Sequence, residues 1–227
     1  MLEVPRLKMA DRQCRYVSGQ ARIAQILEAA MDVLIEHGYS AITLREIARR
    51  CGIRVGAVSY YYDSREALIR DLVEAIIGPY VDEFDAIRQA RERPAEDRFA
   101  DVVRLILEDI QTKKATRVWP ELWVMATRDP LIQEMVEAAY SRARVVLNDL
   151  LAELNPSLGT RERETVAMFI SASLEGTTMF IGYEKPWADR IEWVENIAVF
   201  SLLSLAKTIT PERVKSLQPP EATSVAA

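Results

Sequence analysis

The chain has 227 residues, of which 49% are hydrophobic and 28% charged, and its formal net charge is −5 at pH 7. This length allows one large helical domain, or a small domain joined to a larger one. The sequence has no apolar run of the roughly 18 residues that span a membrane, and no apolar segment typical of a signal peptide. Two cysteines cannot build a disulfide framework, and one histidine excludes a histidine-rich zinc site. We therefore expect a cytoplasmic protein that binds no metal, no other cofactor and no membrane.

Charge is unevenly distributed along the chain. Residues 1–70 contain 11 Lys and Arg against 8 Asp and Glu, whereas residues 71–227 contain 18 against 26. A mildly basic end on an acidic body can still bind phosphates. The first 17 residues are either a flexible basic arm that lies on phosphates or a plain solvated terminus. The cations of this segment are Arg6, Lys8, Arg12 and Arg15.

Apolar residues recur at the helical period through nearly every segment, and strand-like alternation is scarce. This pattern predicts an all-α fold of about nine helices. The first predicted helix spans residues 18–37 and ends before Gly38. The second begins at Thr43, the first residue of a capping box in which Glu46 closes the reciprocal hydrogen bond. After a glycine turn, a short third helix follows over residues 55–61.

Longer helices are predicted in the rest of the chain. Ser64 caps a long fourth helix, which Pro79 is expected to kink. Later helices are predicted over residues 94–110, 129–154, 160–183 and 188–209, and a tryptophan-rich segment, RVWPELWVMA, lies between the first two. Residues 210–227 have little to bury, which predicts a disordered tail.

Residues 43–62 carry the strongest functional signal. A capped helix, a glycine turn and a second short helix match the size of a helix-turn-helix. Apolar groups on such a helix can touch thymine methyls, and tyrosine hydroxyls can reach phosphates. The residues expected on its outer face are Arg54, Val55, Ala57, Tyr60 and Tyr61. The alternative is that the arginine is simply solvated and that the tyrosines fill a core.

In this register the segment resembles the TetR family of transcriptional regulators over roughly residues 18–70. The matching positions are Gly38, Tyr39, Thr43, Arg45, Ile47, Ala48, Gly52, Ile53, Gly56, Val58, Tyr60, Tyr61, Tyr62, Ser64, Arg65, Glu66 and Leu68. The resemblance implies a three-helix DNA-binding domain followed by a larger helical domain that binds a small ligand and dimerises. We therefore expect a basic arm at residues 1–17, a helix-turn-helix domain at 18–64, an effector-binding and dimerisation domain at 65–209, and the tail at 210–227.

The resemblance also implies which residues contact DNA. Arg45 would reach a base edge, where a bidentate pair with guanine contributes about 1–3 kcal/mol of discrimination. Thr43, Tyr61 and Arg65 would contact phosphates, and Gly56 would let the backbone approach the duplex. The full expected set is Thr43, Arg45, Arg54, Val55, Gly56, Ala57, Tyr60, Tyr61, Ser64 and Arg65.

Two positions depart from the family pattern. The family often has Ser or Thr, a helix cap, where this chain has Arg54, and Lys or a polar residue where it has Val55. The missing cap costs about 1 kcal/mol locally, and the new charge lies beside the DNA. The operator sequence therefore does not follow from that of any relative.

Two later segments are predicted to form a dimer interface. Stripes of apolar and small residues run along the predicted helices 160–183 and 188–209, and two such helices from each subunit would make a four-helix interface. The expected interface residues are Phe169, Ile170, Ser173, Leu174, Thr177, Val194, Ile197, Ser201 and Leu202. The alternative is that these stripes only fill the core of one subunit.

The middle of the chain is expected to hold an effector pocket. Aromatic residues with carboxylates can bind a cation by cation–π attraction and charge. The expected pocket residues are Trp119, Trp123, Tyr140, Glu175, Met179 and Tyr183, with Glu121, Met125 and Trp187 as further candidates. The pattern WPELW, with LEG later in the chain, resembles the choline-sensing betaine-regulator branch of the family. The alternative is that these aromatics only fill a core.

Together these features predict a ligand-responsive transcriptional regulator and not an enzyme. We expect a homodimer that binds a palindromic DNA operator as a repressor and is released by a small-molecule effector. Activation is the other possible response. A helical adaptor that has lost DNA binding is an alternative because of the unusual Arg54-Val55 pair. An all-helical enzyme is a further alternative, but the sequence offers no acid–base pair for it.

Overall fold

The computed structural model describes residues 17–216, and every regular element in that range is a helix. The α-helices are α1 Val17–His37, α2 Leu44–Arg50, α3 Val55–Ser59, α4 Arg65–Gln89, α5 Ala95–Ile110, α6 Lys113–Ala126, α7 Pro130–Leu154, α8 Thr160–Gly176, α9 Thr178–Ile181, α10 Ile191–Thr208 and α11 Pro211–Ser216. Two short 3₁₀ helices are η1 Tyr39–Ala41 and η2 Ala188–Arg190. The all-α prediction is confirmed. The predicted basic arm lies outside the described residues, except for its last position.

Side-chain caps fix the beginnings of several helices. The Ser64 hydroxyl accepts a hydrogen bond from the Ala67 amide at 3.1 Å, at the start of α4. Asp129 accepts from the Leu131 amide at 2.9 Å, and Pro130 follows as the first residue of α7. These helices therefore begin where their short-range sequence signals predict.

The capping box of α2 is only half formed. The Thr43 hydroxyl accepts from the Glu46 amide at 3.1 Å, as expected. The Glu46 carboxylate does not return the bond; it accepts from Arg49 at 2.8 and 2.6 Å and from Arg50 at 3.4 Å. Two guanidinium groups on the next turn are stronger partners for a carboxylate than one backbone amide.

Three helix predictions need correction. The helix predicted over residues 160–183 is divided at Thr177 into α8 and α9. The tryptophan-rich segment, for which no helix was predicted, forms α6 with Pro120 inside it. Part of the predicted disordered tail forms α11, because Val214 is buried in the core of the C-terminal half and gives this segment apolar area to bury. The rest of the tail, residues 217–227, lies outside the described residues.

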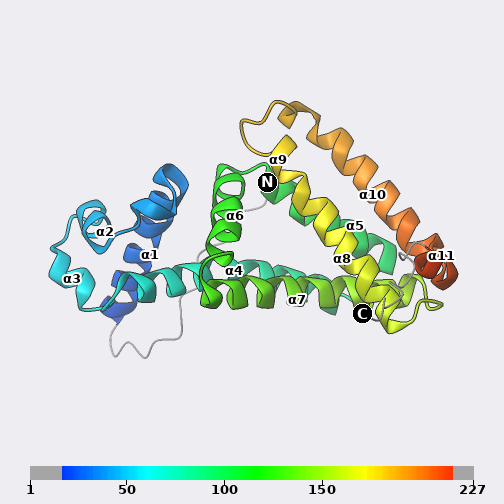
Figure 1. Ribbon diagram of the computed structural model, residues 1–227, viewed down its shortest axis with the longest axis horizontal. Coiled ribbons are helices and arrows are strands. Elements are labelled where there is room, and N and C mark those ends of the chain that lie inside the picture. The colour runs from blue at the N-terminus through cyan, green and yellow to red at the C-terminus, as the bar shows by residue number, and fades with distance from the viewer. Residues whose placement is uncertain (1–16, 217–227) are drawn as a thin grey trace, which may run out of the picture.

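The helices bury two hydrophobic cores that α4 and α7 connect. The first core joins α1–α4 to α6 and the start of α7, and the second joins the end of α4 to α5, α7, α8, α10 and α11. Figure 1 shows α4 and α7 running together along the long axis, with α1–α3 at one end and α6 standing between them and α8. The N-terminal helices therefore pack on the larger domain through α1, which contacts α6 directly.

Among the described residues, no helix is long and apolar enough to cross a lipid bilayer. The same part of the chain contains no group of three or more His, Cys, Asp or Glu side chains arranged to hold a metal ion.

Candidate DNA-binding face and effector cavity

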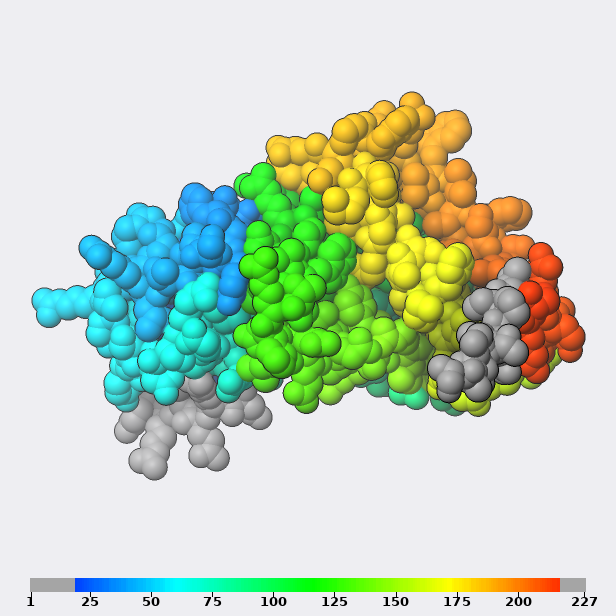
Figure 2. Space-filling model, viewed as in Figure 1, coloured from blue at the N-terminus to red at the C-terminus, as the bar shows by residue number. Residues whose placement is uncertain are grey.

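The outer side of α3 forms a surface that no other helix of residues 17–216 covers. Arg54, Val55, Gly56 and Ala57 are all exposed, whereas Val58 on the opposite side is fully buried against the first core. The N-terminus of α3 has no side-chain cap, as the Arg54 position predicted. In Figure 2 the cyan segment that contains α3 occupies the extreme end of the molecule, where a long duplex can approach without meeting the other domain.

Arg45 on the neighbouring helix α2 is available for an external partner. It is exposed on α2 and makes no ion pair or hydrogen bond with any described residue. Its neighbours differ, because Arg49 binds Glu46 and Arg50 binds both Glu46 and Glu36. Thr43, one turn earlier, is also exposed.

The three consecutive tyrosines take three different positions. Tyr60 is 82% exposed and lies edge-on to Tyr61, with 5.0 Å between ring centroids. Tyr61 is half-buried, so that one side of its ring is covered by the core. Tyr62 is fully buried and takes the inward position that the family resemblance implies.

Arg65 is held inside the DNA-binding domain. Its guanidinium donates to the Ile42 carbonyl at 2.6 Å, the Tyr39 carbonyl at 2.9 Å and the Tyr39 hydroxyl at 3.1 Å. It also lies 4.2 Å from the centroid of the Tyr39 ring. These bonds tie the start of α4 to the loop between α1 and α2. The expected phosphate contact of Arg65 would therefore have to use the N–H donors that these bonds leave over.

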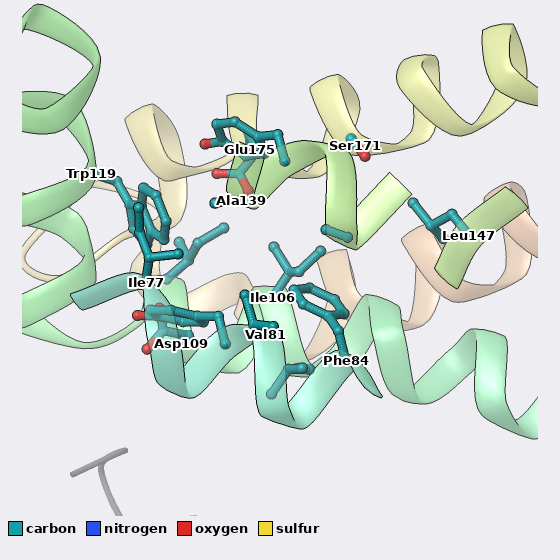
Figure 3. A pocket seen from close by; sticks show the side chains of 15 residues that line it. Ile77, Val81, Phe84, Ile106, Asp109, Trp119, Ala139, Leu147, Ser171 and Glu175 are labelled. Carbon is teal, nitrogen blue, oxygen red and sulfur yellow. The ribbon is translucent and has the colours of Figure 1, made fainter. Parts of the chain in front are cut away.

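The larger domain encloses a small cavity among α4, α5, α6, α7 and α8. Its empty space is about 50 Å³, enough for only a few water molecules. Apolar side chains make most of its wall, and Figure 3 shows Ile77, Val81, Phe84 and Ile106 along one side. Tyr80, Trp119 and Tyr140 form a continuous aromatic wall, with ring centroids 5.3 and 5.9 Å apart.

Two carboxyl groups reach this cavity from different helices. Asp109 of α5 accepts a hydrogen bond from the Tyr80 hydroxyl at 2.7 Å, and Glu175 of α8 lies across the cavity (Figure 3). Burial raises the pKa of Asp109, although the Tyr80 hydroxyl and the Lys114 ammonium act against that rise. Burial, and then the charge of Asp109, raise the pKa of Glu175 to about 7. No Lys or Arg of the described chain forms an ion pair with Glu175.

The expected pocket residues separate into two groups. Trp119, Tyr140 and Glu175 line the cavity, and the Trp123 indole donates to the Tyr140 hydroxyl at 2.8 Å from behind. The others do not reach it. Met179 and Tyr183 are 55% and 37% exposed, and Trp187, Met125 and Glu121 also lie away from the cavity. The break at Thr177 ends α8 before Met179, and in the short helix α9 Thr178 and Ile181 face inward while Met179 is exposed.

Sequence reasoning missed Tyr80, Phe84 and Asp109 as cavity residues. Asp109 carried a usable signal, since it lies directly before Ile110 and three positions after Ile106 on the apolar stripe of α5. A carboxylate on the buried face of a helix is costly unless it has a partner. Tyr80 and Phe84 carried no such signal, because aromatic residues on a buried helix usually fill a core.

Helix α6 connects this cavity to the DNA-binding domain. Trp119 of α6 lines the cavity, while Glu121 accepts a hydrogen bond from the Tyr39 amide at 3.1 Å. Arg117 donates to the Ile35 carbonyl in the last turn of α1 at 3.2 Å. Gly38 lies at the same contact with φ +77°, and a Cβ there would come within 2.9 Å of the Glu121 carboxylate. A movement of α6 would therefore displace the end of α1, to which it is hydrogen-bonded.

The expected dimer residues also separate into two groups. Three of them are buried in the second core of their own subunit and cannot contact a partner: Ile170, Leu174 and Leu202. Phe169, Ile197 and Ser201 are exposed, and Ser173, Thr177 and Val194 are partly exposed. The large exposed apolar side chains on these helices are Met168, Phe169, Met179, Phe180, Trp193, Ile197 and Phe200. Three of the nine expected interface residues therefore belong to the core of their own subunit.

Comparison with known proteins identifies this architecture. Residues 26–72 match the family model of bacterial regulatory proteins of the tetR family. The chain belongs to the TetR family. Residues 95–194 match the C-terminal domain of BetI-type transcriptional repressors. Both family models and the curated relatives are transcriptional regulators. This agrees with the prediction of a transcriptional regulator and not an enzyme.

Relatives of this TetR-family chain are distant in sequence. The HTH-type transcriptional regulator BetI of Escherichia coli is 22% identical over 160 residues, which cover 68% of this chain and 79% of BetI. A TetR-family regulator from Mesorhizobium loti has the same fold, with a TM-score of 0.68, 15% identity and coverage of 84% and 98% of the two chains. The regulator FadR of Bacillus subtilis, solved with stearoyl-CoA, has a TM-score of 0.58, 19% identity and coverage of 81% and 97%.

Proposed function

We propose that this TetR-family regulator is a homodimeric repressor whose affinity for a palindromic operator falls when an organic cation binds the cavity beside α6. The observation that carries the proposal is the position of α6. One of its side chains lines a cavity with two carboxyl groups, while two others bond to the backbone at the end of α1. The names of the BetI-type relatives, which are repressors and regulators, support the direction of the response.

The proposed DNA contacts centre on α2 and α3. Arg45 is exposed and unpaired within the described chain, so its guanidinium can pair with a guanine edge at no internal cost. The exposed residues Val55, Gly56 and Ala57 let the α3 backbone approach the bases closely. Thr43, Arg54, Tyr60, Tyr61 and Ser64 remain proposed contacts.

A cation fits the cavity better than an anion or a neutral polar compound. Glu175 has no Lys or Arg ion-pair partner in the described chain, so an anion would find no opposite charge there and would oppose ionisation of the carboxyl group. The rings of Trp119 and Tyr140 can supply cation–π attraction, which strengthens when water is excluded, whereas the Tyr80 ring already has the Lys114 ammonium 5.8 Å from its centroid. Binding of the cationic effector would favour loss of the Glu175 proton, and the resulting carboxylate would pair with the cation.

The small size of the cavity explains how binding could be transmitted. Pockets for drug-sized ligands are roughly 300–1,000 Å³, whereas this cavity has about 50 Å³ of empty space. An effector must therefore push its walls apart, and α6 is one of those walls. Displacement of α6 would pull on Ile35 and Tyr39 and rotate the DNA-binding domain, so the effector and DNA would favour different arrangements.

Dimerisation is proposed through the exposed apolar face of α8 and α10. Trp193 and Phe200 are 74% and 76% exposed, and Phe169 and Ile197 are also exposed. A monomer rarely leaves so many large apolar side chains in water, and such a patch marks an interaction site. A two-fold partner is the natural occupant because an operator with two half-sites requires a two-fold protein.

A gel-shift titration tests the proposal. The DNA upstream of the chain's own gene should give one discrete, sequence-dependent shift, with a salt slope that reflects several phosphate contacts. Arg45→Ala should weaken that binding by roughly tenfold and relax specificity at one base pair, which is the loss of one bidentate contact. A thermal-shift screen that includes quaternary amines should find a cation that raises the Tm. The same compound should release the DNA, so that the shifted band disappears from the gel. Arg45→Ala binding as tightly as the parent would refute the proposed role of this arginine.

A further inference from the structure

A second hollow lies on the outer surface directly beside the cavity. It is a groove between α4 and α7 with about 340 Å³ of empty space, far more than the cavity behind it. We call this groove the vestibule. Its outer rim carries Glu74 and Asp82 from α4 and Arg142 from α7, all with exposed side chains.

The vestibule and the cavity share the same separating wall. Ile77, Val81 and Ala139 line both hollows, so a single layer of side chains divides them. Figure 3 shows Ile77, Val81 and Ala139 beside the cavity. Ala139 contributes only a methyl group, and Ile77 and Val81 are aliphatic side chains that rotate without breaking a hydrogen bond. The wall is therefore thin and free of polar contacts.

Helix α4 is weakened at this same point. Gly78 and Pro79 lie inside α4, between Ile77 and Val81. Proline has no amide hydrogen, so the carbonyl of Ala75 lacks the helical donor it would otherwise receive from position 79. Gly78 adds backbone freedom, and it lines the groove without a side chain. A local outward bend of α4 at this pair would separate Ile77 and Val81 from Ala139.

We propose that the vestibule is the outer half of the effector site, and that an organic cation enters the cavity between α4 and α7 by displacing Ile77, Val81 and Ala139. The inference rests on the proposed function because it takes the cavity as the effector site. Among the described residues that line the rim, two carboxylates stand against one guanidinium, which favours a cation. The carboxyl groups of Asp109 and Glu175 then hold the same charge once it has passed the wall.

A buried cysteine can report on this route without a known effector or operator. Leu147 lines the cavity but not the vestibule and is 1% exposed, so Leu147→Cys in a Cys14→Ser, Cys51→Ser background places one thiol inside. The rate of its modification by a cationic reagent, trimethylammonium-ethyl methanethiosulfonate, measures passage into the cavity. Circular dichroism of each variant confirms that the fold is kept.

Blocking the wall should slow the reaction. Ala139→Phe fills the shared wall and should lower the modification rate by at least about tenfold. Gln133→Phe adds the same ring to an exposed position of α7 that lines neither hollow, and should leave the rate unchanged within about twofold. Ala139→Leu serves as a smaller block if the phenylalanine variant is unfolded.

The charge of the rim gives an independent readout. The pair of changes Glu74→Gln and Asp82→Asn should slow the cationic reagent and leave the neutral methyl methanethiosulfonate unaffected, with the difference fading at high salt. The inference is overturned if the thiol reacts equally fast with Ala139 blocked, or if it does not react in the unblocked protein. Because none of these rates involves DNA, a failure of repression and a failure of this route would be told apart.

Discussion

Replacing Arg65 with alanine separates two roles that sequence and structure assign to this side chain. By resemblance, Arg65 contacts a phosphate. In the structure its guanidinium makes three hydrogen bonds, to the carbonyls of Ile42 and Tyr39 and to the Tyr39 hydroxyl. The structural role predicts a loss of stability, whereas a phosphate role predicts a loss of DNA affinity alone.

The magnitude follows from those contacts. A hydrogen bond from a charged group contributes about 1.5–3 kcal/mol, and the contact with the Tyr39 ring adds roughly 0.5–1 kcal/mol at a partly exposed site. The three bonds share one side chain and are not additive, so we expect Arg65→Ala to lower the free energy of unfolding by about 3 kcal/mol. For a chain of this size, that corresponds to a fall in Tm of roughly 6–12 °C.

Thermal and urea denaturation, monitored by circular dichroism, measure this loss. Arg45→Ala is the matched control, because Arg45 is exposed and has no partner in the described chain, so its Tm should change little. Arg65→Lys should recover part of the stability, since an ammonium group can reach some of the same oxygens but lacks the planar fork. Suppose instead that Arg65→Ala has the same Tm as the parent and only lowers the salt slope of DNA binding by about one. Arg65 would then be a phosphate ligand, and its internal bonds would contribute nothing to stability.

Three further changes test the larger domain. Because the pKa of Glu175 is raised to about 7, its carboxyl is neutral below that pH and ionised above it, so affinity for a quaternary ammonium should rise between about pH 6 and 8. The same raised pKa makes stability fall as pH rises from about 4.5 towards 7, and Glu175→Gln should flatten both profiles when binding and Tm are followed against pH. Phe200→Glu places a charge in the proposed interface and should yield a folded monomer by analytical ultracentrifugation; a dimer of unchanged stability would exclude this face. Glu121→Gln weakens the charge-assisted bond to the Tyr39 amide, and should reduce the effector's ability to release DNA while each ligand still binds separately in titrations; unchanged release would show that coupling does not pass through this bond.

The DNA-binding domain could be predicted in detail because its signals are local. The hydroxyls of Thr43 and Ser64 each accept a hydrogen bond from the backbone amide three residues later. Val58 and Tyr62 are buried, as the helical period requires. Such signals act within one turn and depend little on the rest of the fold. Arg65 is the exception, since its partners lie 23 and 26 positions earlier in the chain.

The sequence by itself determined that the chain is helical, where most helices begin, and which segment forms the helix-turn-helix, because helical period, capping residues and glycine turns are properties of a few neighbouring residues. Only the tertiary structure decided which side of α8 and α10 is buried, so that Ile170 and Leu202 became core while Phe169 and Phe200 stayed exposed. The tertiary structure also determined which residues line the cavity, whose two carboxyl groups come from α5 and α8. A helix presents its residues in a fixed order around its axis, but the direction it faces is set by the helices that pack on it.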